Sequence, residues 1–559
     1  MIVLGIDTGG TYTDAVLFEN IAGRVLAKAK SPTTHQKLET GITSAIEKLN
    51  SADFKIDKVV LSTTLATNAI VENQGRPTGL IIVGDPPKGE LPDSHVARVA
   101  GKVNVKGKII TPLDEAAAVS AIDAMADEVE AFAVSGMMSV RNASLELQVK
   151  DLIQNKTSLP VVCGHELSAK LGFHDRTVTT VLNASLIPII ENFILSVEKS
   201  LSQFEITAPV YMVKGDGNLA SLRFIRQKPI ESILSGPAAS VIGALSLAQT
   251  GDGIVIDMGG TTTDAGVVRS HQLTLSPVGA KVGHWQTQVD SAEISTWGLG
   301  GDTQIIPGED LQPVLTGNRI LPACRGGDAG LTPTDLLHIS GEYVVWDETA
   351  ARSLAKQQAA ICQRSLEDYC NAAEQRIFNI IDVHVLQQYR SQVVKETEPQ
   401  YGYVRRVEGV VAERENLLEI LPIIAIGAPA GTWYSKLSQQ TGQPVIIPEH
   451  FEVANAVGAA CASVEERVEV LVRPDEANEA YNVFANGQAT PFKDKDEAVA
   501  YAKTIAEDLA RDAAQAQGLS EIYVQQSAEE VVERSGLGER YVETKVFAVA
   551  KASPLVLTK

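Results

Sequence analysis

Residues 5–17 read GIDTGGTYTDAVL and residues 255–267 read VIDMGGTTTDAGV. At a constant offset of 250, eight of these thirteen positions are identical. Each copy follows one apolar run and precedes another, which predicts a strand, a Gly-Gly turn and a second strand, with a carboxylate on each side of the turn. A plain turn has no need to repeat its acids and threonines, so the repeat indicates two related lobes.

The two turns have the chemistry of phosphate sites. Glycine lets the backbone approach a ligand closely, and successive N–H groups in such a turn converge on phosphate oxygens, while hydroxyls at the rim add donors. Neither turn is a P-loop or a Rossmann turn, so the repeat predicts a nucleotide clamped between two lobes. The candidate phosphate-binding residues are Thr8, Gly9, Gly10, Thr11, Tyr12 and Thr13 in the first copy and Gly259, Gly260, Thr261 and Thr262 in the second.

Carboxylates flank both turns. Asp7 and Asp257 stand at strand ends, where a carboxylate can hold Mg²⁺ through the waters that the ion retains or can orient an attacking water. We therefore predict these two as catalytic residues and metal ligands. Asp14 and Asp264 either share these roles or hydrogen-bond their own turns, and Asp264 is included among the candidate Mg²⁺ ligands.

These motifs resemble the two phosphate motifs of the actin, sugar-kinase and Hsp70 superfamily. Within it the chain is similar to the hydantoinase A and 5-oxoprolinase family, which includes ATP-dependent subunits of hydantoinases and of acetone and acetophenone carboxylases. Further elements follow in that family's order along residues 1–464. They are STTLATNA at 62–69, DRTVTTVLNA at 175–184, SGPAA at 235–239, GLGG at 298–301, PAC and GG within 322–327, TPTD at 332–335, GAPAG at 427–431 and the segment 453–460. Three positions depart from the family pattern: Leu61-Ser62 replaces a His-Gly pair, and Asp302 replaces a glycine.

The resemblance implies Mg·ATP as cofactor, with the adenosine near Gly427, Ala428 and Pro429 and further nucleotide contacts from Gly300 and Gly301. It also implies ATP-dependent opening of a cyclic amide of the hydantoin or 5-oxoproline type, by phosphorylation of the amide oxygen. A kinase-like transfer to a small metabolite and a nucleotide-gated chaperone or reactivase remain open alternatives.

A second set of residues is placed on the substrate side by the same resemblance. The candidates are Thr63, Thr64, Asn68 and Arg176. Spacing alone favours a helix cap for the first three and a surface ion pair with Asp175 for Arg176. The family also implies a hydantoinase B-like partner subunit, and the C-terminal region is a candidate homo-oligomer interface.

The composition is that of an ordinary globular protein, with 44% hydrophobic and 21% charged residues. The formal charge of −21 disfavours nucleic acid and anionic membrane surfaces as partners, but does not exclude ATP, because backbone N–H groups and a metal ion can bind phosphate locally. Five scattered cysteines without a Cys-x-x-Cys pair predict free thiols in a reducing compartment. No leader is visible and the apolar stretch at 186–194 is short and interrupted, so we expect a cytoplasmic protein without a membrane span.

The expected fold is α/β, with two ribonuclease-H-like (actin-like ATPase) lobes around a nucleotide cleft and a small C-terminal α/β domain. The expected divisions are an N-terminal lobe at residues 1–185, a second lobe with a helical segment at 186–465, and the C-terminal domain at 466–559. The helical segment is predicted over 351–395, and the last domain is predicted to contain strands around one long helix at 495–514.

Overall fold

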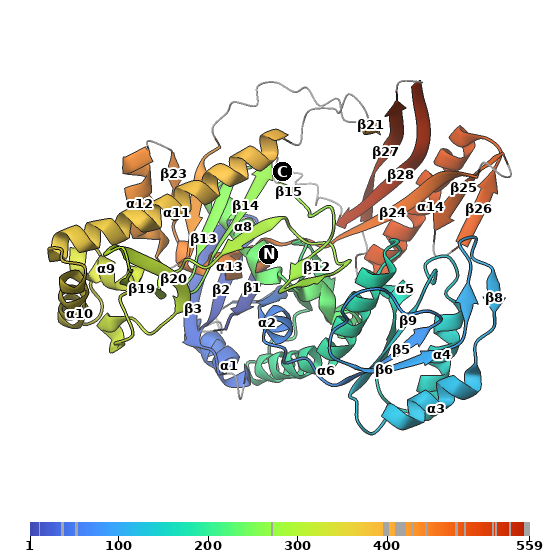
Figure 1. The fold of residues 1–559 in the computed structure, drawn as a ribbon, viewed down its shortest axis with the longest axis horizontal. Helices are drawn as coiled ribbons and strands as arrows, with labels where there is room; N and C mark the ends of the chain where they lie inside the picture. The colour runs from blue at the N-terminus through green and yellow to red at the C-terminus, as the bar shows by residue number, and fades with distance from the viewer. Residues whose placement is uncertain are drawn as a thin grey trace.

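The computed structural model describes most of the 559 residues. The described ranges are 1–10, 12–34, 38–50, 54–269, 272–394, 402–408, 421–427, 429–441, 444–475, 479–485, 488–516, 519, 522–535 and 538–552. The structure is α/β throughout, and two similar sheets form its centre (Figure 1).

The first sheet is built on the first Gly-Gly hairpin. Its strands are β1 (Ile2–Thr8), β2 (Tyr12–Glu19), β3 (Arg24–Pro32), β4 (Lys58–Thr63), β11 (Val210–Val213) and β12 (Leu219–Ser221), in the order β12-β11-β4-β1-β2-β3. The hairpin strands are antiparallel, whereas β4 and β11 continue the sheet in parallel with β1. Nearly every residue of β1 and β2 is buried, as the continuous apolar runs predict.

The second sheet repeats this order. It contains β13 (Gly253–Met258), β14 (Thr263–Arg269), β15 (Gln272–Leu273), β22 (Ile423–Ile426) and β23 (Val445–Ile446), in the order β15-β14-β13-β22-β23, and β18 (Ile294–Trp297) also pairs with β14. Again the hairpin strands are antiparallel and the next two strands are parallel. The sequence repeat therefore corresponds to two lobes of one topology, which confirms the predicted fold class.

Two helices lie between the lobes and cross at very short range. Helix α8 (Ser235–Ala248) contacts β13 and β22 of the second sheet, and α13 (Ala454–Cys461) contacts β1, β2 and β4 of the first. A Cβ on Gly243 would lie 1.9 Å from the carbonyl oxygen of Ala454, and one on Gly458 would lie 1.7 Å from that of Ala239. The two glycines thus allow a backbone-to-backbone contact that holds the lobes together.

A separate parallel sheet is inserted into the first lobe. Its strands are β5 (Thr78–Val83), β6 (His95–Val99), β9 (Ala131–Gly136) and β10 (Val161–Cys163), in the order β10-β9-β5-β6, with α3 (Glu115–Met125) and α4 (Ser144–Lys156) packed on it. Helix α6 (Phe173–Gln203) leads from this sheet back to the first lobe. It runs through residue 185, and β11 and β12 after it complete the first sheet, so that sheet extends past the expected division at 185.

Helix α6 is longer than the interrupted apolar stretch at 186–194 suggested, because Pro188 lies inside it without ending it. By length and composition it is the one described helix that could cross a membrane, but 61% of the relevant window is buried within the protein. It packs as a core helix of the first lobe, with Phe193 and Val197 fully buried.

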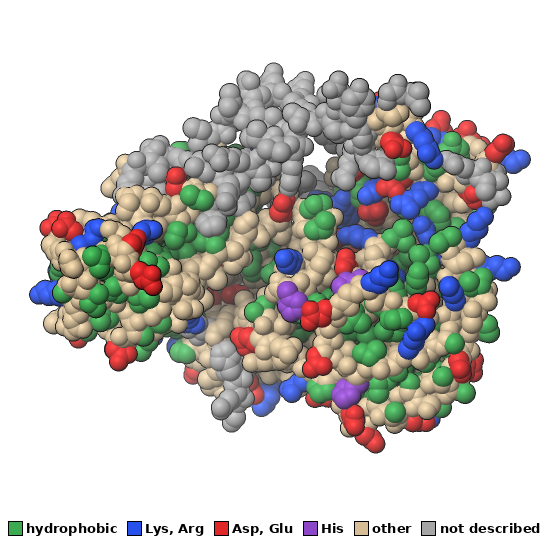
Figure 2. All heavy atoms as spheres, in the orientation of Figure 1, with side chains coloured by type: hydrophobic (Ala, Val, Ile, Leu, Met, Phe, Trp, Pro, Cys, Tyr) green, Lys and Arg blue, Asp and Glu red, His purple; other side chains and the backbone are tan. Residues whose placement is uncertain are grey.

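The second lobe has a helical part, as predicted, formed by α9 (Pro333–Ser340), α10 (Glu348–Ile361) and α11 (Leu366–Val394). The C-terminal region is also α/β, as predicted. It contains β24 (Glu465–Asp475), β25 (Ala480–Ala485), β26 (Gln488–Phe492), α14 (Lys495–Ala516), β27 (Ile522–Ser535) and β28 (Gly538–Ala552). Strand β21 (Gly402–Glu408) joins this sheet by pairing with β27, across the expected division at 465. On the face drawn in Figure 2, acidic and basic side chains are interspersed.

Candidate active site

The first hairpin places its polar residues at the mouth of the space between the lobes. Asp7 pairs with Asp14 and Thr8 with Thr13 across the two strands, and Gly9 N donates to Tyr12 O over 3.0 Å. The Thr33 hydroxyl, at the end of β3, donates to Gly9 O over 2.9 Å. The hydroxyl of Thr8 is buried and has no hydrogen-bond partner among the described residues, so it is available to a ligand.

The second hairpin has the same register, with Asp257 opposite Asp264 and Gly259 N donating to Thr262 O over 2.9 Å. The segment at 300–302 lies directly on this turn. Gly301 N donates to Gly259 O over 2.9 Å and Asp302 N donates to Gly260 O over 2.7 Å. A Cβ on Gly300 would lie 2.5 Å from Thr261 N, so this contact requires glycine. The predicted residues Gly300 and Gly301 therefore support the second phosphate turn.

The predicted adenosine loop also lies against the second hairpin. Gly427 has φ +91°, and a Cβ there would lie 2.2 Å from the carbonyl oxygen of Met258 and 2.7 Å from Asp257 Oδ1. A Cβ on Gly301 would lie 3.2 Å from the ring of Pro429. Two of the predicted nucleotide residues, Thr11 and Ala428, lie outside the described residues. The predicted residues of the second hairpin therefore lie together with Gly300, Gly301, Gly427 and Pro429, although up to 170 positions separate them in the sequence (429 − 259).

A chain of polar contacts connects the two strand-end aspartates. Asn455 Nδ2 lies 3.5 Å from Asp7 Oδ2, and Asn455 Oδ1 lies 2.7 Å from Ser240 Oγ. Ser240 Oγ in turn lies 2.7 Å from Asp257 Oδ2. Ser240 comes from α8 and Asn455 from α13, so the crossing of these helices places both groups between the hairpins. The sequence reasoning missed both residues. Asn455 lies within the segment 453–460 and Ser240 directly follows the element 235–239, so the resemblance offered a usable signal for both.

Burial raises the pKa of the carboxyl groups at the two hairpins. Burial and then the charge of Asp14 raise the pKa of Asp7 to about 6, and the charge of Asp257 acts in the same direction. Burial and the charge of Asp257 raise the pKa of Asp264 to about 7. The pKa of Asp257 is also raised by burial, although the hydrogen bond from Ser240 opposes the shift. The effect of Asp257 on Asp7 agrees with the polar contacts through Asn455 and Ser240 that connect the two hairpins.

One cation that the sequence reasoning did not single out lies beside this cluster. Lys30 of β3 stands opposite Asp14 in the sheet, and its Nζ lies 3.0 Å from the Asp14 carboxylate. Its positive charge opposes the rise in the pKa of both Asp14 and Asp257. Only the pairing of β3 with β2 brings Lys30 to this position.

The acid cluster fits a divalent cation. Asp7 Oδ1 is buried without a hydrogen-bond partner among the described residues, and carboxylate oxygens are the ligands that Mg²⁺ prefers. Asp257 faces the same space, whereas Asp264 accepts a 2.5 Å hydrogen bond from Thr296 Oγ1, which occupies one of its oxygens.

The candidate substrate residues Thr63, Thr64 and Asn68 border the first hairpin. The Thr63 hydroxyl donates to Thr8 O over 3.0 Å and accepts from Leu65 N over 3.1 Å, whereas Thr64, in the cap position of helix α2 (Leu65–Val71), makes no side-chain cap bond. Asn68 Nδ2 donates to Thr64 Oγ1 over 3.3 Å. All three line a cleft of about 1140 Å³ together with Thr8, Gly9 and Gly10.

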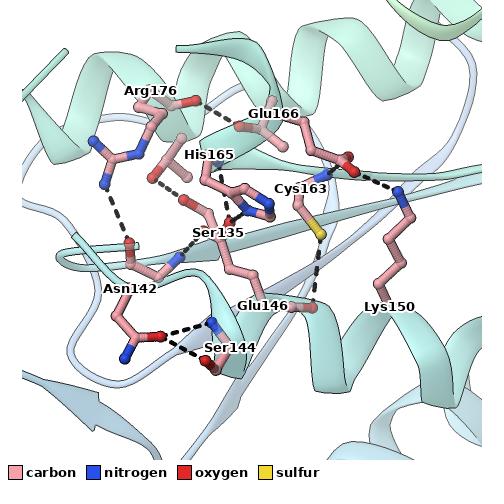
Figure 3. A network of polar contacts seen from close by, with 12 residues as sticks. Ser135, Asn142, Ser144, Glu146, Lys150, Cys163, His165, Glu166 and Arg176 are labelled. Atoms are coloured by element: carbon pink, nitrogen blue, oxygen red, sulfur yellow. Dashed lines mark hydrogen bonds and ion pairs between the residues drawn. The ribbon is translucent and has the colours of Figure 1, made fainter. Parts of the chain in front are cut away.

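Arg176 is not part of this group. It is 1% exposed and donates to the carbonyl oxygens of Gly136 and Lys170 over 3.1 and 3.2 Å. Figure 3 shows its side chain among the polar contacts at the inserted sheet. The prediction of a surface ion pair between Arg176 and Asp175 is wrong. Helix α6 directs the Arg176 side chain towards the edge of the inserted sheet, and Asp175 pairs with His174 instead. The position of Arg176 there indicates a structural role.

Glu146 lies in the same network (Figure 3). It accepts hydrogen bonds from Gly136 N over 2.7 Å and from His165 N over 3.1 Å, and its Oε2 lies 2.6 Å from His165 Nδ1. Glu146, Cys163 and His165 offer ligand atoms within 4.8 Å of one another, but both carboxylate oxygens are already engaged. The five cysteines are free, as predicted, and burial raises the pKa of Cys324 to about 12, which agrees with a non-catalytic thiol.

Comparison with known proteins agrees with this arrangement. The hydantoinase/oxoprolinase family matches residues 176–468, and the N-terminal region of that family matches residues 3–157. The chain belongs to the hydantoinase/oxoprolinase family. The two matches together cover both hairpins and every candidate site residue.

Individual relatives share part of the chain. The caprolactamase subunit alpha of Pseudomonas jessenii is 29% identical over 370 residues, which are 59% of this chain and 53% of the relative. The acetophenone carboxylase gamma subunit of Aromatoleum aromaticum is 25% identical over 348 residues, 53% of this chain and 46% of the relative. The chain thus spans about half the length of these curated relatives. The crystal structure of the ATP-dependent caprolactamase from Pseudomonas jessenii has a TM-score of 0.74 at 21% identity, covering 99% of this chain and 88% of the other, which shows a shared fold.

Proposed function

We propose that this member of the hydantoinase/oxoprolinase family uses ATP to open a cyclic amide. The observation that carries the proposal is the pair of facing Gly-Gly hairpins, whose strand-end aspartates are connected through Asn455 and Ser240. Such a pair of turns suits a triphosphate held between two lobes. A relative named as a caprolactamase subunit and a structural neighbour named as an ATP-dependent caprolactamase support a lactam as the second substrate.

The nucleotide is proposed to lie between the hairpins. The N–H groups of Gly9, Gly10, Gly259 and Gly260 would bind phosphate oxygens, and the adenosine would lie towards Gly427 and Pro429. Asp7 and Asp257 would hold Mg²⁺, which neutralises phosphate charge when it is bound. Asp264 would contribute less to holding the ion, because Thr296 already donates a hydrogen bond to one of its oxygens.

The reaction divides into three steps. The amide oxygen of the substrate attacks the γ-phosphorus, the bond to the β-phosphate bridge oxygen breaks, and ADP leaves. The resulting imidate-type phosphate has a carbon that water can attack. The water adduct then breaks its C–N bond, which opens the ring as the nitrogen leaves as an amine after taking up a proton. A second water hydrolyses the remaining acyl phosphate to a carboxylate and inorganic phosphate. A carboxylate oxygen of Asp7 or Asp257 that the ion does not engage would take the proton from the attacking water.

The cellular setting is also a proposal. Relatives named as alpha and gamma subunits support a second subunit of the hydantoinase B type, which would act together with this chain. The buried packing of α6 and the free cysteines support a cytoplasmic location.

The decisive variant is Asp257→Asn, which retains the shape of the side chain but removes its charge. We expect loss of at least about 100-fold in lactam-dependent ADP formation, in a protein that melts at no lower temperature than the unsubstituted chain, as for removal of a major electrostatic contribution to catalysis. Asp328→Asn, the same change at an exposed position, is the control. Retained activity in Asp257→Asn would refute the site. A stable phosphoester product would indicate a kinase, and turnover stimulated by a protein but not by a lactam would indicate a reactivase.

A further inference from the structure

The cleft beside the first hairpin has a distinctive distribution of charge. It is lined by residues of α1 (Leu38–Lys48), α2 and α6 and by Gly9 and Gly10 of the first hairpin. The three helices are neighbours in Figure 1. With a volume of about 1140 Å³ it can hold a lactam ring together with sizeable substituents. This inference rests on the proposed function, because it takes the cleft as the place where the cyclic amide binds.

The inner end of the cleft is polar but uncharged. Beside the hairpin its polar lining side chains are hydroxyls and one amide, contributed by Thr8, Thr33, Thr63, Thr64 and Asn68, and Leu65 adds an apolar side chain. The unpartnered Thr8 hydroxyl is 4% exposed. The Asn68 amide lies next to the hairpin, since its Nδ2 would be 3.5 Å from a Cβ on Gly10. An amide and hydroxyls can both donate to and accept from a cyclic amide, which itself has one N–H donor and one carbonyl acceptor.

The charged side chains that line the cleft stand elsewhere, at its outer rim. There the two cations already face carboxylates: Lys199 Nζ lies 2.9 Å from Glu39 Oε2, and Arg76 Nε lies 4.0 Å from Glu130. The remaining rim charges, Glu47 and Glu72, are negative.

The hairpin adjoining the inner end is itself acidic. Asp7 and Asp14 lie directly behind it, and the nearby Lys30 is paired with Asp14. A substrate carboxylate beside the hairpin would therefore lose its hydration and approach two aspartates, while the described basic residues of the lining, Arg76 and Lys199, lie at the exposed rim and face carboxylates.

We propose that the cleft selects uncharged, hydrogen-bonding cyclic amides or ureides, such as hydantoins and neutral lactams, and discriminates against lactams that carry a carboxylate, such as 5-oxoproline. Asn68 and Thr64 bind the amide group, and the polar outer part of the cleft accommodates a neutral substituent. The distribution of charge, more than the size of the cleft, sets the substrate class.

The test compares two compounds of equal size, 5-oxoproline and its carboxamide 5-oxoprolinamide, which differ in charge at one substituent. ADP formation by the full chain, together with its partner subunit if one is required, is measured with each over a range of concentrations. We expect kcat/KM to be at least about 10-fold higher for the carboxamide. Equal values, or a preference for 5-oxoproline, would overturn the inference while leaving the proposed function in place. No stimulation by either compound, by hydantoin or by caprolactam would overturn both.

A variant that introduces a positive charge provides an independent check. Leu65 lines the inner end of the cleft at the start of α2, and Leu65→Arg supplies the missing cation there. It should reduce the preference for the carboxamide at least about 5-fold. Val71→Arg is the matched control, because Val71 is 59% exposed on the same helix and does not line the cleft. An unchanged preference in a folded Leu65→Arg protein, or an equal change in Val71→Arg, would contradict the assignment of this cleft.

Discussion

Ser240 Oγ lies 2.7 Å from Asp257 Oδ2, at the point where α8 crosses α13. The same hydroxyl is 2.7 Å from Asn455 Oδ1 and has a single hydrogen, so it can donate to only one of the two at a time. Since Asn455 also reaches Asp7, the state of one lobe's aspartate is coupled to that of the other through two neutral side chains. This coupling joins residues that are 250 positions apart in the sequence.

Ser240→Ala should lower lactam-dependent ADP formation by about 10- to 100-fold. A hydrogen bond to a charged group contributes about 1.5–3 kcal/mol, and without it Asp257 is less well oriented and binds protons more readily. Steady-state rates over a pH series would measure this, and the acidic limb should move to higher pH. The control is Ser246→Ala on the same helix, where the hydroxyl contacts Cys461 and not the acid cluster. A purely structural role for Ser240 would leave the pH profile in place.

Lys30→Gln should reduce ATP turnover by at least about 10-fold, because the positive charge at the acid cluster also lies where a triphosphate would bind. Lys28→Gln is the matched control, two residues earlier on the same strand, where Lys28 pairs with Glu452 instead. The variant should weaken binding of Mg·ATP more than that of Mg·ADP, as titration calorimetry can measure.

The Asp14→Asn background separates two roles of Lys30. If Lys30 only neutralises Asp14, removing that carboxylate should abolish the effect of Lys30→Gln. If Lys30 binds phosphate, the substitution should still lower ATP turnover by a similar factor in this background. We expect the second result.

Asp264→Asn should stabilise the nucleotide-free protein at pH 8 more than at pH 4.5. Its folded-state pKa of about 7 lies above the usual 3.8, so between these values the fold retains a proton that the unfolded chain has lost. The free energy of unfolding therefore falls as pH rises towards 7, and the full cost of the buried charge is present above that pH. Thermal melts without Mg²⁺ at both pH values would show this, with Asp328→Asn as the exposed control. Equal stabilisation at the two pH values would contradict the raised pKa.

Gly427→Ala should abolish most ATP turnover and destabilise the second lobe by about 1–3 kcal/mol or more. The new Cβ would lie 2.2 Å from Met258 O, so the loop must move away from the hairpin. Gly326→Ala separates this clash from backbone strain, because Gly326 has a similar φ of +94° and no atom within 4 Å of the added Cβ. It should lose stability but not activity. Similar losses of activity in both variants would assign the effect to strain alone.

The geometry of the two candidate phosphate turns could be predicted from the sequence, because it is local. Gly9, Gly10 and Asp7 are contained in a single hairpin, and a hairpin's register places Asp7 opposite Asp14 without reference to the rest of the chain. The repeat at offset 250 extended this to the second lobe, and the shared strand order confirms that interpretation. The inserted parallel sheet was not foreseen, since its buried apolar strands have no periodicity that distinguishes them from the strands of the first lobe.

The sequence by itself determined two lobes with Gly-Gly turns, because backbone freedom and short-range hydrogen bonds depend on residues close together in the chain. Only the tertiary structure decided which other side chains take part. Lys30 joins the acid cluster through a neighbouring strand, and Ser240 and Asn455 meet through two helices 215 residues apart (455 − 240). Arg176 is not part of the site, because α6 places its side chain in the buried interior. Burial and the summed field of distant charges raise the pKa values of the aspartates, and these properties arise only when the chain has folded.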